Sequence, residues 1–143
     1  MNVNIVLLNE KAFIPQKQTE RSSGFDLFSS EDKILKPRCF ELISTGISIE
    51  IPRGYEAQVR PRSGLAAKNG VTVLNSPGTI DADYRGEIKV CLINHSDKEF
   101  KITVGTRIAQ MVFSEVKDAV FHKSERLTDT NRGAGGFGST GLK

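Results

Sequence analysis

The sequence predicts an all-β domain, and three observations support this prediction. Short segments rich in β-branched residues recur along the 143 residues and are separated by Gly, Pro, Asn and Asp. In several of these segments apolar and polar residues alternate with a period of two, as in strands with one buried face. Only the segment from Ser63 to Asn69 has a helical pattern, and Gly70 ends it. A sandwich, a jelly roll or a barrel fits this pattern.

The predicted strands follow one another from the N-terminus. The first two are the run Val3–Leu8 and the segment Phe25–Ser29. Three alternating strands come next, with the inward-facing sets Ile47, Ile49 and Ile51, then Tyr55, Ala57 and Val59, then Ile88, Val90 and Leu92. The last strand, Ile108–Phe113, is nearly continuous in apolar character, so we expect both of its faces to be buried. The prolines at positions 37, 52, 61 and 77 fall between these strands, where a missing N–H costs least.

Length and composition predict a single cytoplasmic domain. The hydrophobic share of 38% and the charged share of 26% are ordinary for a soluble globular protein. Twenty Lys and Arg against 17 acids give a net charge of +3, which does not predict nucleic-acid binding but suits a small polyanionic ligand. No apolar stretch approaches the ~20 residues of a membrane span, and no signal-peptide pattern is present. Cys39 and Cys91 are far apart in the sequence, so we expect two reduced thiols.

The segment Pro61-Arg62-Ser63-Gly64 is a candidate phosphate site. It lies between a predicted strand and the start of the predicted helix. A helix start presents free N–H groups and a partial positive charge, and Arg62 adds a fixed cation. The structural alternative is that Ser63 is only an N-cap, which stabilises a helix by about 1 kcal/mol. Both interpretations stay open on this segment alone.

The segment NSPGTIDADYRG, residues 75–86, is a candidate catalytic loop. Its Asn, Pro and Gly predict a turn, and Asp81 and Asp83 follow directly. An acid in such a position can act as a general base on water. The alternative is a hairpin with solvated acids. The Asp-Ala-Asp sequence is not followed by Gly and Glu at the spacing of a calcium loop.

Three further features are weaker. Asp26 begins a strand in Ser-Gly-Phe-Asp-Leu, and an Asp beside Gly often only makes a turn. Gln110 interrupts an apolar strand, so it bonds either the backbone or a ligand. The glycine-rich stretch from Arg132 to Lys143 predicts either a plain flexible tail or a tail whose N–H groups and Phe137 bind phosphate and a base. His95 and His122 are isolated, so we expect surface positions and no nucleophilic triad.

Five segments in order, SGFDL, PRSGLAAKNG, NSPGTIDADYRG, GTRIAQM and RGAGGFGSTG, resemble the five motifs of the trimeric dUTPase family. Each motif alone is weak to moderate, and all five at family-like spacing from about Ser23 to Gly141 are very specific. The resemblance implies a jelly-roll-like distorted β-barrel over residues 1–131 and a closing arm over residues 132–143. It also implies a homotrimer with three sites shared between subunits, and Mg²⁺ held mainly by the triphosphate. The implied reaction converts dUTP to dUMP and pyrophosphate, which limits uracil in DNA and supplies dUMP for dTMP synthesis.

The resemblance also implies a role for individual residues. Asp81 would activate the water that attacks the α-phosphorus, and Asp26 would act on the metal through water. The remaining substrate contacts would be Arg62, Ser63, Gly64 and Gln110 on the phosphates, Asn75, Thr79 and Ile80 on uracil, Tyr84 beneath the deoxyribose, Lys89, and Arg132, Phe137, Gly138 and Ser139 from the closing arm. The motif pattern, and not the sequence around it, ranks Asp81 above Asp83. Ser23 stands where Ala is common in the family, and we expect that change to be harmless.

Two other functions fit parts of the same sequence. A dCTP deaminase shares the fold and the phosphate handling, but it needs a glutamate beside the base, and Cys91 occupies that position here. A non-catalytic jelly-roll module that binds nucleotides or partners could lose Asp81 or the glycine-rich tail, and both are present. The sequence therefore favours hydrolysis of dUTP over both alternatives.

Overall fold

A computed structural model describes residues 1–136 and contains eleven strands and one short helix in that range. In chain order these are β1 (Asn4–Leu7), β2 (Phe25–Phe28), β3 (Lys33–Leu35), β4 (Phe40–Ser44), β5 (Ile47–Glu50), β6 (Tyr55–Arg60), α1 (Ser63–Asn69), β7 (Val71–Val73), β8 (Gly78–Ile80), β9 (Lys89–Asn94), β10 (Phe100–Ile102) and β11 (Arg107–Glu115). The predicted all-β class with one short helix is therefore confirmed. None of the helices in the described range is long and apolar enough to cross a membrane.

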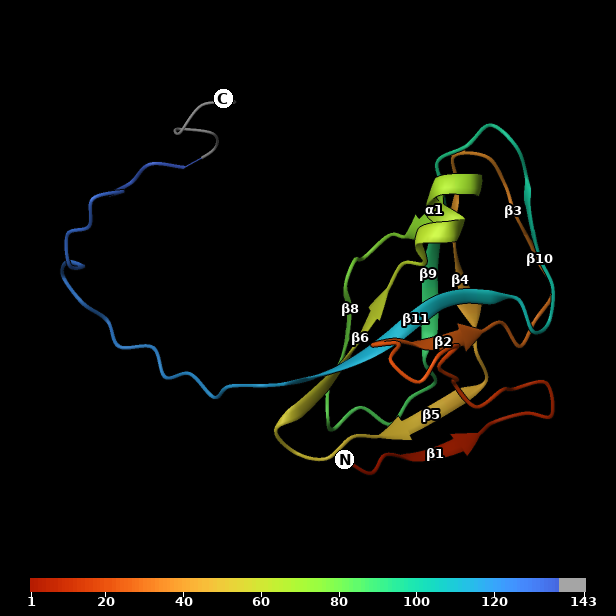
Figure 1. Cartoon of the computed structure of the whole chain (residues 1–143), viewed down its shortest axis with the longest axis horizontal. Coiled ribbons are helices and arrows are strands. Elements are labelled where there is room, and N and C mark those ends of the chain that lie inside the picture. The colour runs from red at the N-terminus through yellow and green to blue at the C-terminus, as the bar shows by residue number, and fades with distance from the viewer. Residues whose placement is uncertain (137–143) are drawn as a thin grey trace.

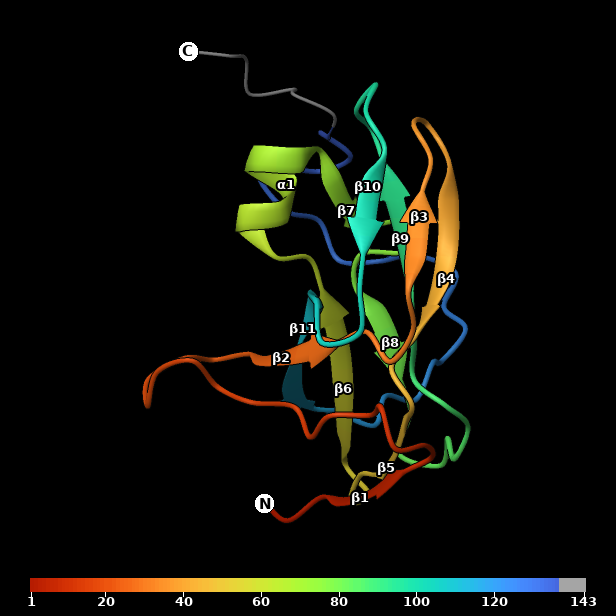
Figure 2. The ribbon, with the colours of Figure 1, turned by 90° about the vertical axis from the view of Figure 1, so that its right-hand side faces the viewer.

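The strands form four antiparallel sheets, which Figures 1 and 2 show from two directions. The largest has the order β2-β11-β6-β8, and a three-stranded sheet has the order β4-β9-β7. Two pairs, β1 with β5 and β10 with β3, complete the set. Over residues 1–136 the sheets stay open and do not close into a barrel, so the expected jelly-roll-like barrel takes the form of separate packed sheets.

One hydrophobic core connects all four sheets. Its members are mostly Val, Ile and Leu, as the absence of Trp requires. The buried set is Leu27, Leu35, Ile43, Ile47, Ile49, Ile51, Ala57, Val59, Val71, Val73, Ile80, Ile88, Val90, Leu92, Ile102, Ile108, Ala109 and Met111. Because every sheet contributes to this one core, the positions of the sheets relative to one another are fixed by packing.

The alternating segments form strands as predicted, with two informative departures. In β6 and β9 the inward set is buried or partly buried and the outward set is more exposed. Ser48 of β5 was expected to face solvent but is buried, because its hydroxyl donates to the Arg85 carbonyl oxygen at 2.7 Å. In β11 only the neighbours Ile108 and Ala109 are both buried, beside a register shift between residues 107 and 109. Met111 is also buried, and the residues from Val112 to Ser114 are partly buried, so the expected burial of both faces along the whole strand is wrong.

Five strands were not among the predicted ones, namely β3, β4, β7, β8 and β10. All except β4 have three residues. A run of three is too short to show a period of two, and its pairing partner is what defines it as a strand. β4 carries Phe40 and Leu42 on an exposed face and the buried Ile43 on the other, so its apolar residues lie on both faces and the alternation breaks after Leu42.

The helix α1 begins at the predicted residue, and one of the two interpretations of Ser63 is excluded. Arg62 is the N-cap, in an extended conformation and without a side-chain capping bond, and Ser63 is the first helical residue. The alternative that Ser63 is the N-cap is therefore wrong, and its hydroxyl is not committed to capping. Gly70 ends the helix in the left-handed conformation with φ 65°, as the sequence predicts.

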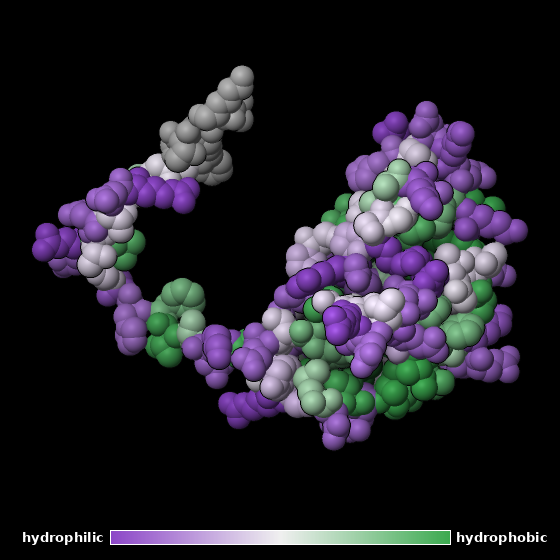
Figure 3. Space-filling view, in the orientation of Figure 1, coloured by the Kyte–Doolittle hydropathy of each residue, from purple (hydrophilic) through white to green (hydrophobic). Residues whose placement is uncertain are grey.

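The chain leaves the β body after β11. The Val116 N–H donates to the Gly54 carbonyl oxygen at 2.9 Å, and residues 117–136 are exposed or partly exposed and contain no strand or helix. Figure 1 shows this segment extending away from the sheets, and Figure 3 shows hydrophobic side chains along it. Val120, Phe121 and Leu127 are its large exposed apolar residues. His95 and His122 are exposed and both thiols are free, as predicted.

Asn94→Ala is expected to lower the free energy of unfolding by about 2–4 kcal/mol, because buried partners lose their bonds. The Asn94 amide donates to the carbonyl oxygens of Leu35 and Lys98 at 3.1 and 2.8 Å, and its oxygen accepts the Ser96 N–H at 3.0 Å. Urea unfolding measures the change. Exposed Asn131→Ala is the control, and equal stability of the two variants would contradict this role.

Candidate functional site

The pairing of β11 with two neighbours brings three distant segments together. Gln110 in β11 lies opposite Asp26 of β2 on one side and Arg60 of β6 on the other. Pro61 ends β6, so Arg62 and Ser63 follow within two or three residues of that pairing. The sheet register therefore places the predicted residues of three motifs at one end of the four-stranded sheet.

Asp26 lies between two arginines at this point. Its side chain is almost buried, and its two oxygens lie 3.2 Å from Arg62 Nε and 3.1 Å from Arg107 Nη1. Arg62 Nη1 also donates to the Arg107 carbonyl oxygen at 2.9 Å. Two of the three Arg62 side-chain nitrogens are thus held by the protein. The two guanidinium groups and the one carboxylate leave a net positive charge at this point. Sequence reasoning missed Arg107, although it lies within the motif that contains Gln110.

Gln110 serves the backbone and the cavity at once. Its amide nitrogen donates to the Pro61 carbonyl oxygen at 2.9 Å. A Cβ added at Gly24 would collide with the Gln110 amide oxygen, so Gly24 is required for the close approach of β2 to this side chain. Both alternatives offered by the sequence therefore hold in part, because the same side chain bonds the backbone and lines a cavity.

These residues surround a polar cavity of about 310 Å³, here called the phosphate cavity. Its lining is Gln18, Ser22, Ser23, Gly24, Asp26, Arg62, Ser63, Gly64 and Gln110. Five predicted site residues meet here. At the start of the helix, the N–H groups of Leu65 and Ala66 both donate to the Arg62 carbonyl oxygen. The two N–H groups before them, those of Ser63 and Gly64, are therefore left for a ligand. The cavity suits a polyanion of several phosphate groups.

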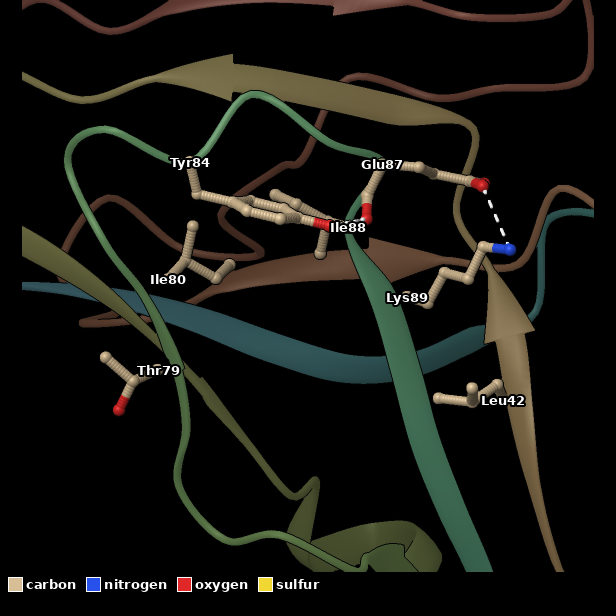
Figure 4. Close-up of a pocket in the computed structure, with 7 residues that line it drawn as sticks. All are labelled: Leu42, Thr79, Ile80, Tyr84, Glu87, Ile88 and Lys89. Carbon is tan, nitrogen blue, oxygen red and sulfur yellow. Dashed lines mark hydrogen bonds and ion pairs between the residues drawn. The ribbon is translucent and has the colours of Figure 1, made fainter.

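A second cavity of about 530 Å³, here called the ring cavity, lies between β8 and β9 (Figure 4). Its lining is Leu42, Thr79, Ile80, Tyr84, Glu87, Ile88 and Lys89. Four predicted site residues meet here, and the other three, Leu42, Glu87 and Ile88, were not predicted as site residues. The Tyr84 ring lies beside Ile80 with its hydroxyl toward Glu87, and Lys89 Nζ lies 3.5 Å from the Glu87 carboxylate. An aromatic face with polar neighbours suits a flat or ring-shaped group.

The loop from β8 to β9 carries Tyr84 and is tied to the body by polar contacts. The Glu87 carboxylate accepts the Gly46 N–H at 3.0 Å, and the Ile88 N–H donates to the Ile47 carbonyl oxygen at 2.9 Å. Arg85 reaches Glu50 at 3.4 Å. The hydrogen bond from Asn4 and the nearby Arg85 charge hold the pKa of Glu50 below its usual value. The loop has no regular structure, so these contacts define its shape.

The two acids of this loop face different cavities. Asp81 lines a cavity of about 230 Å³ with Arg53, Glu56 and Asp118, whereas Asp83 lines one of about 600 Å³ with Arg85. Both are exposed. Asp81 lines neither the phosphate cavity nor the ring cavity. Asn75 is exposed at the turn before β8, where its amide lies near Gly78.

The predicted residues of the glycine-rich arm are only partly described. Arg132 is exposed and its Nε donates to the Gly135 carbonyl oxygen at 2.9 Å. Phe137, Gly138 and Ser139 lie outside the described residues. The phosphate cavity and the ring cavity of one chain are separate, because their lining residues have no member in common.

The residues present fit a metal carried by the ligand. Among residues 1–136, no group of three or more His, Cys, Asp or Glu could hold a metal ion. Asp26 is the only acid among the residues that line the phosphate cavity. Mg²⁺ keeps several waters and binds through few carboxylates and phosphate oxygens. Asp26 could therefore contact such an ion through water, while a triphosphate supplied the direct ligands.

The fold and the cavities together define an all-β protein with a polar cavity that contains an arginine and a second cavity beside an aromatic ring. The sequence matches the family model described as dUTPase over residues 10–141. The chain belongs to the dUTPase family.

Known proteins resemble the chain over nearly its whole length. It is 59% identical over 141 residues to the deoxyuridine 5'-triphosphate nucleotidohydrolase of Nautilia profundicola, with 99% of each chain covered. It resembles the dUTPase of Staphylococcus bacteriophage 80alpha solved with dUPNHPP, with a TM-score of 0.92, 26% identity and 99% of both chains covered. A variant of the phage phi11 dUTPase of S. aureus that coordinates a structural Mg(II) ion has a TM-score of 0.83, 22% identity, and coverage of 90% of this chain and 100% of that one.

Arg107→Ala is expected to lower the free energy of unfolding by about 1–2 kcal/mol and to weaken pyrophosphate binding. Asp26 loses one of two partners, and its carboxylate then competes more strongly for Arg62. Urea unfolding and titration calorimetry with pyrophosphate measure the two effects. Exposed Arg126→Ala is the control. Unchanged pyrophosphate binding in Arg107→Ala would contradict the proposed link between Arg107 and Arg62.

Proposed function

We propose that this protein hydrolyses dUTP to dUMP and pyrophosphate at sites shared between copies of the chain. The observation that carries this proposal is the convergence of Asp26, Arg62, Ser63 and Gln110 on one polar cavity of about 310 Å³. These residues come from three segments that are far apart in the sequence. Membership of the dUTPase family supports this reaction. The alignment with a deoxyuridine 5'-triphosphate nucleotidohydrolase over 99% of both chains supports it further.

The phosphate cavity holds the triphosphate. The uncommitted Arg62 nitrogen, the N–H groups of Ser63 and Gly64, and the Ser63 hydroxyl face the anion. Asp26 keeps Arg62 in one orientation, so the cation is positioned before the ligand arrives. Preorganised donors stabilise charge that develops on phosphate oxygens during the reaction.

The ring cavity holds the nucleoside. Thr79 and Ile80 present backbone groups of β8 to the uracil edge, with Asn75 at the preceding turn. The Tyr84 ring packs beneath the deoxyribose and leaves no room for a 2′-hydroxyl. Lys89 adds positive charge at the rim, where Glu87 orients it. The chain thereby selects the deoxyribose by shape and the base by hydrogen bonding.

Asp81 is the general base that deprotonates the attacking water. Its exposed position allows it to meet a ligand bound by another copy of the chain. Asp26 would hold Mg²⁺ through water when the ion arrives with the triphosphate, and the ion would supply neutralisation of phosphate charge. Attack at phosphorus depends on positioning and charge neutralisation, which this residue set supplies.

The separation of the two cavities in one chain supports sharing of the site between copies. The phosphate cavity and the ring cavity have no lining residue in common, and Asp81 lines neither. A closed homotrimer lets the phosphate cavity of one copy face the ring cavity of the next, which makes three equivalent sites. The arm of residues 132–143, with Arg132, Phe137, Gly138 and Ser139, closes each site and excludes water.

We also propose a cytoplasmic location, which the free thiols of Cys39 and Cys91 support.

Asp81→Asn is expected to lower kcat for dUTP at least about 100-fold and to leave dUTP binding largely intact, because the change removes the base and keeps the size. Pyrophosphate release measures turnover, and titration with a non-hydrolysable dUTP analogue measures binding. Asp83→Asn is the matched control two residues away.

Wild-type protein is assayed in parallel with dCTP and UTP, and we expect both to be poor substrates. Turnover of Asp81→Asn near the wild-type rate would exclude Asp81 as the base. Binding of dUTP without any turnover by the wild-type protein would instead indicate a non-catalytic nucleotide-binding module. Release of ammonia from dCTP would indicate a deaminase.

A further inference from the structure

The Tyr84 ring lies directly against the backbone of Gly86. A Cβ built at Gly86 would collide with the Tyr84 hydroxyl, and it would lie 2.6 Å from Tyr84 Cζ and 3.0 Å from Tyr84 Cε2. Real Cβ atoms essentially never come that close to backbone or ring atoms. The ring can therefore occupy its observed place only when residue 86 has no side chain. Gly86 has no positive φ, so backbone conformation does not explain the glycine.

A hydrogen bond holds the same ring at its far end. The Tyr84 hydroxyl donates to the Glu87 carbonyl oxygen at 2.9 Å. Figure 4 shows the ring lying along the loop with its hydroxyl end at Glu87. Contact with Gly86 and the bond to Glu87 together leave the ring little freedom to slide or turn. Tyr84 is nevertheless 45% exposed, so its other face is open to a ligand.

The backbone on both sides of Gly86 is tied to strand β5 and the turn before it. The Arg85 carbonyl oxygen accepts the Ser48 hydroxyl at 2.7 Å. The Glu87 carboxylate accepts the Gly46 N–H at 3.0 Å, and the Ile88 N–H donates to the Ile47 carbonyl oxygen at 2.9 Å. A side chain at residue 86 would thus meet a loop held by three hydrogen bonds to β5 and its preceding turn, and a ring held by one hydrogen bond. The ring, not the loop, would have to give way.

Gly46, which anchors Glu87, is itself restricted to glycine. Its φ is +69°, and a Cβ there would lie 2.6 Å from Asn9 Nδ2 and 2.9 Å from the Ala12 Cβ. The anchor therefore lies in a turn that the N-terminal segment covers. This arrangement connects the position of the loop to the rigid part of the fold.

We propose that Gly86 is a positioning residue that sets how strictly the enzyme distinguishes deoxyribose from ribose. This inference rests on the proposed function, in which the Tyr84 ring packs beneath the sugar. Gly86 does not touch the substrate. It fixes how far the Tyr84 ring extends into the ring cavity, and this position of the Tyr84 ring decides whether a 2′-hydroxyl fits. A displaced ring leaves a gap or a tilt beneath C2′, and UTP is then less strongly rejected.

The decisive quantity is the ratio of kcat/KM for dUTP to kcat/KM for UTP. Gly86→Ala is expected to lower this ratio at least about tenfold, since one misplaced methyl-sized group in a pocket changes discrimination by that order. Tyr84→Phe keeps the ring and removes the bond to Glu87, and it is expected to lower the ratio about threefold. A merely structural role of Gly86 would lower stability without changing the ratio.

A glycine at the end of α1 supplies the matched control. Gly70 has φ +65°, so Gly70→Ala strains the backbone and lowers the thermal midpoint. It lies outside the loop from β8 to β9, and we expect it to leave the ratio unchanged. Thermal unfolding of every variant shows which of them fold, and Tyr84→Phe tests the proposal if Gly86→Ala does not fold.

The double variant Gly86→Ala with Tyr84→Ala tests whether Gly86 acts through the Tyr84 ring, separately from whether that ring faces the sugar. Without the ring, the added methyl group meets nothing from Tyr84, so Gly86→Ala should change the ratio no further. If Gly86→Ala lowers the ratio equally with and without the ring, Gly86 acts by another route and the proposal is overturned. An unchanged ratio in Gly86→Ala also overturns it. An unchanged ratio in Tyr84→Ala alone shows instead that the ring does not face the sugar, which is a failure of the proposed function.

Discussion

The pairing of β11 with β2 on one side and β6 on the other is the constraint on which the phosphate cavity depends. This double pairing sets Gln110 opposite Asp26 and puts Arg62 just past the end of β6. Asp26 then joins Arg62 to Arg107, and Gln110 joins β11 to the Pro61 carbonyl oxygen. Gly24 is needed because Gln110 lies so close to β2. Backbone register and a few polar contacts thus hold a cation in place before any ligand binds.

The ring cavity depends on a different kind of support. Its loop has no ladder of its own and is held by side chains and single backbone contacts to β5 and the turn before it. This support fixes Tyr84, while the phosphate cavity is fixed by the central sheet. The two cavities have no lining residue in common in one chain, and the proposed function requires association of copies to bring them to one ligand.

The sequence predicted the elements whose signals are local. Alternation predicted β6 and β9, and Gly70 predicted the end of α1. It did not predict the three-residue strands, because pairing partners define them. Arg107 was missed because its partner Asp26 is 81 residues away in sequence. The sequence left the role of Ser63 open because a Ser at a helix start is a common N-cap, whereas here Arg62 takes that position without a side-chain capping bond. Gly86 and Glu87 were missed because their roles depend on where the Tyr84 ring lies, which sequence spacing does not state.

Shared sites are tested most directly by mixing two inactive variants, Asp81→Asn and a chain that ends before Arg132. They are unfolded together in equal amounts and refolded, and native mass spectrometry confirms that mixed trimers form. If Asp81 and the arm of one site come from different copies, about a quarter of the sites are complete. Turnover of dUTP should then rise toward about that fraction of the wild-type rate. Mixed trimers with no more activity than either parent would show that each site is built within one chain.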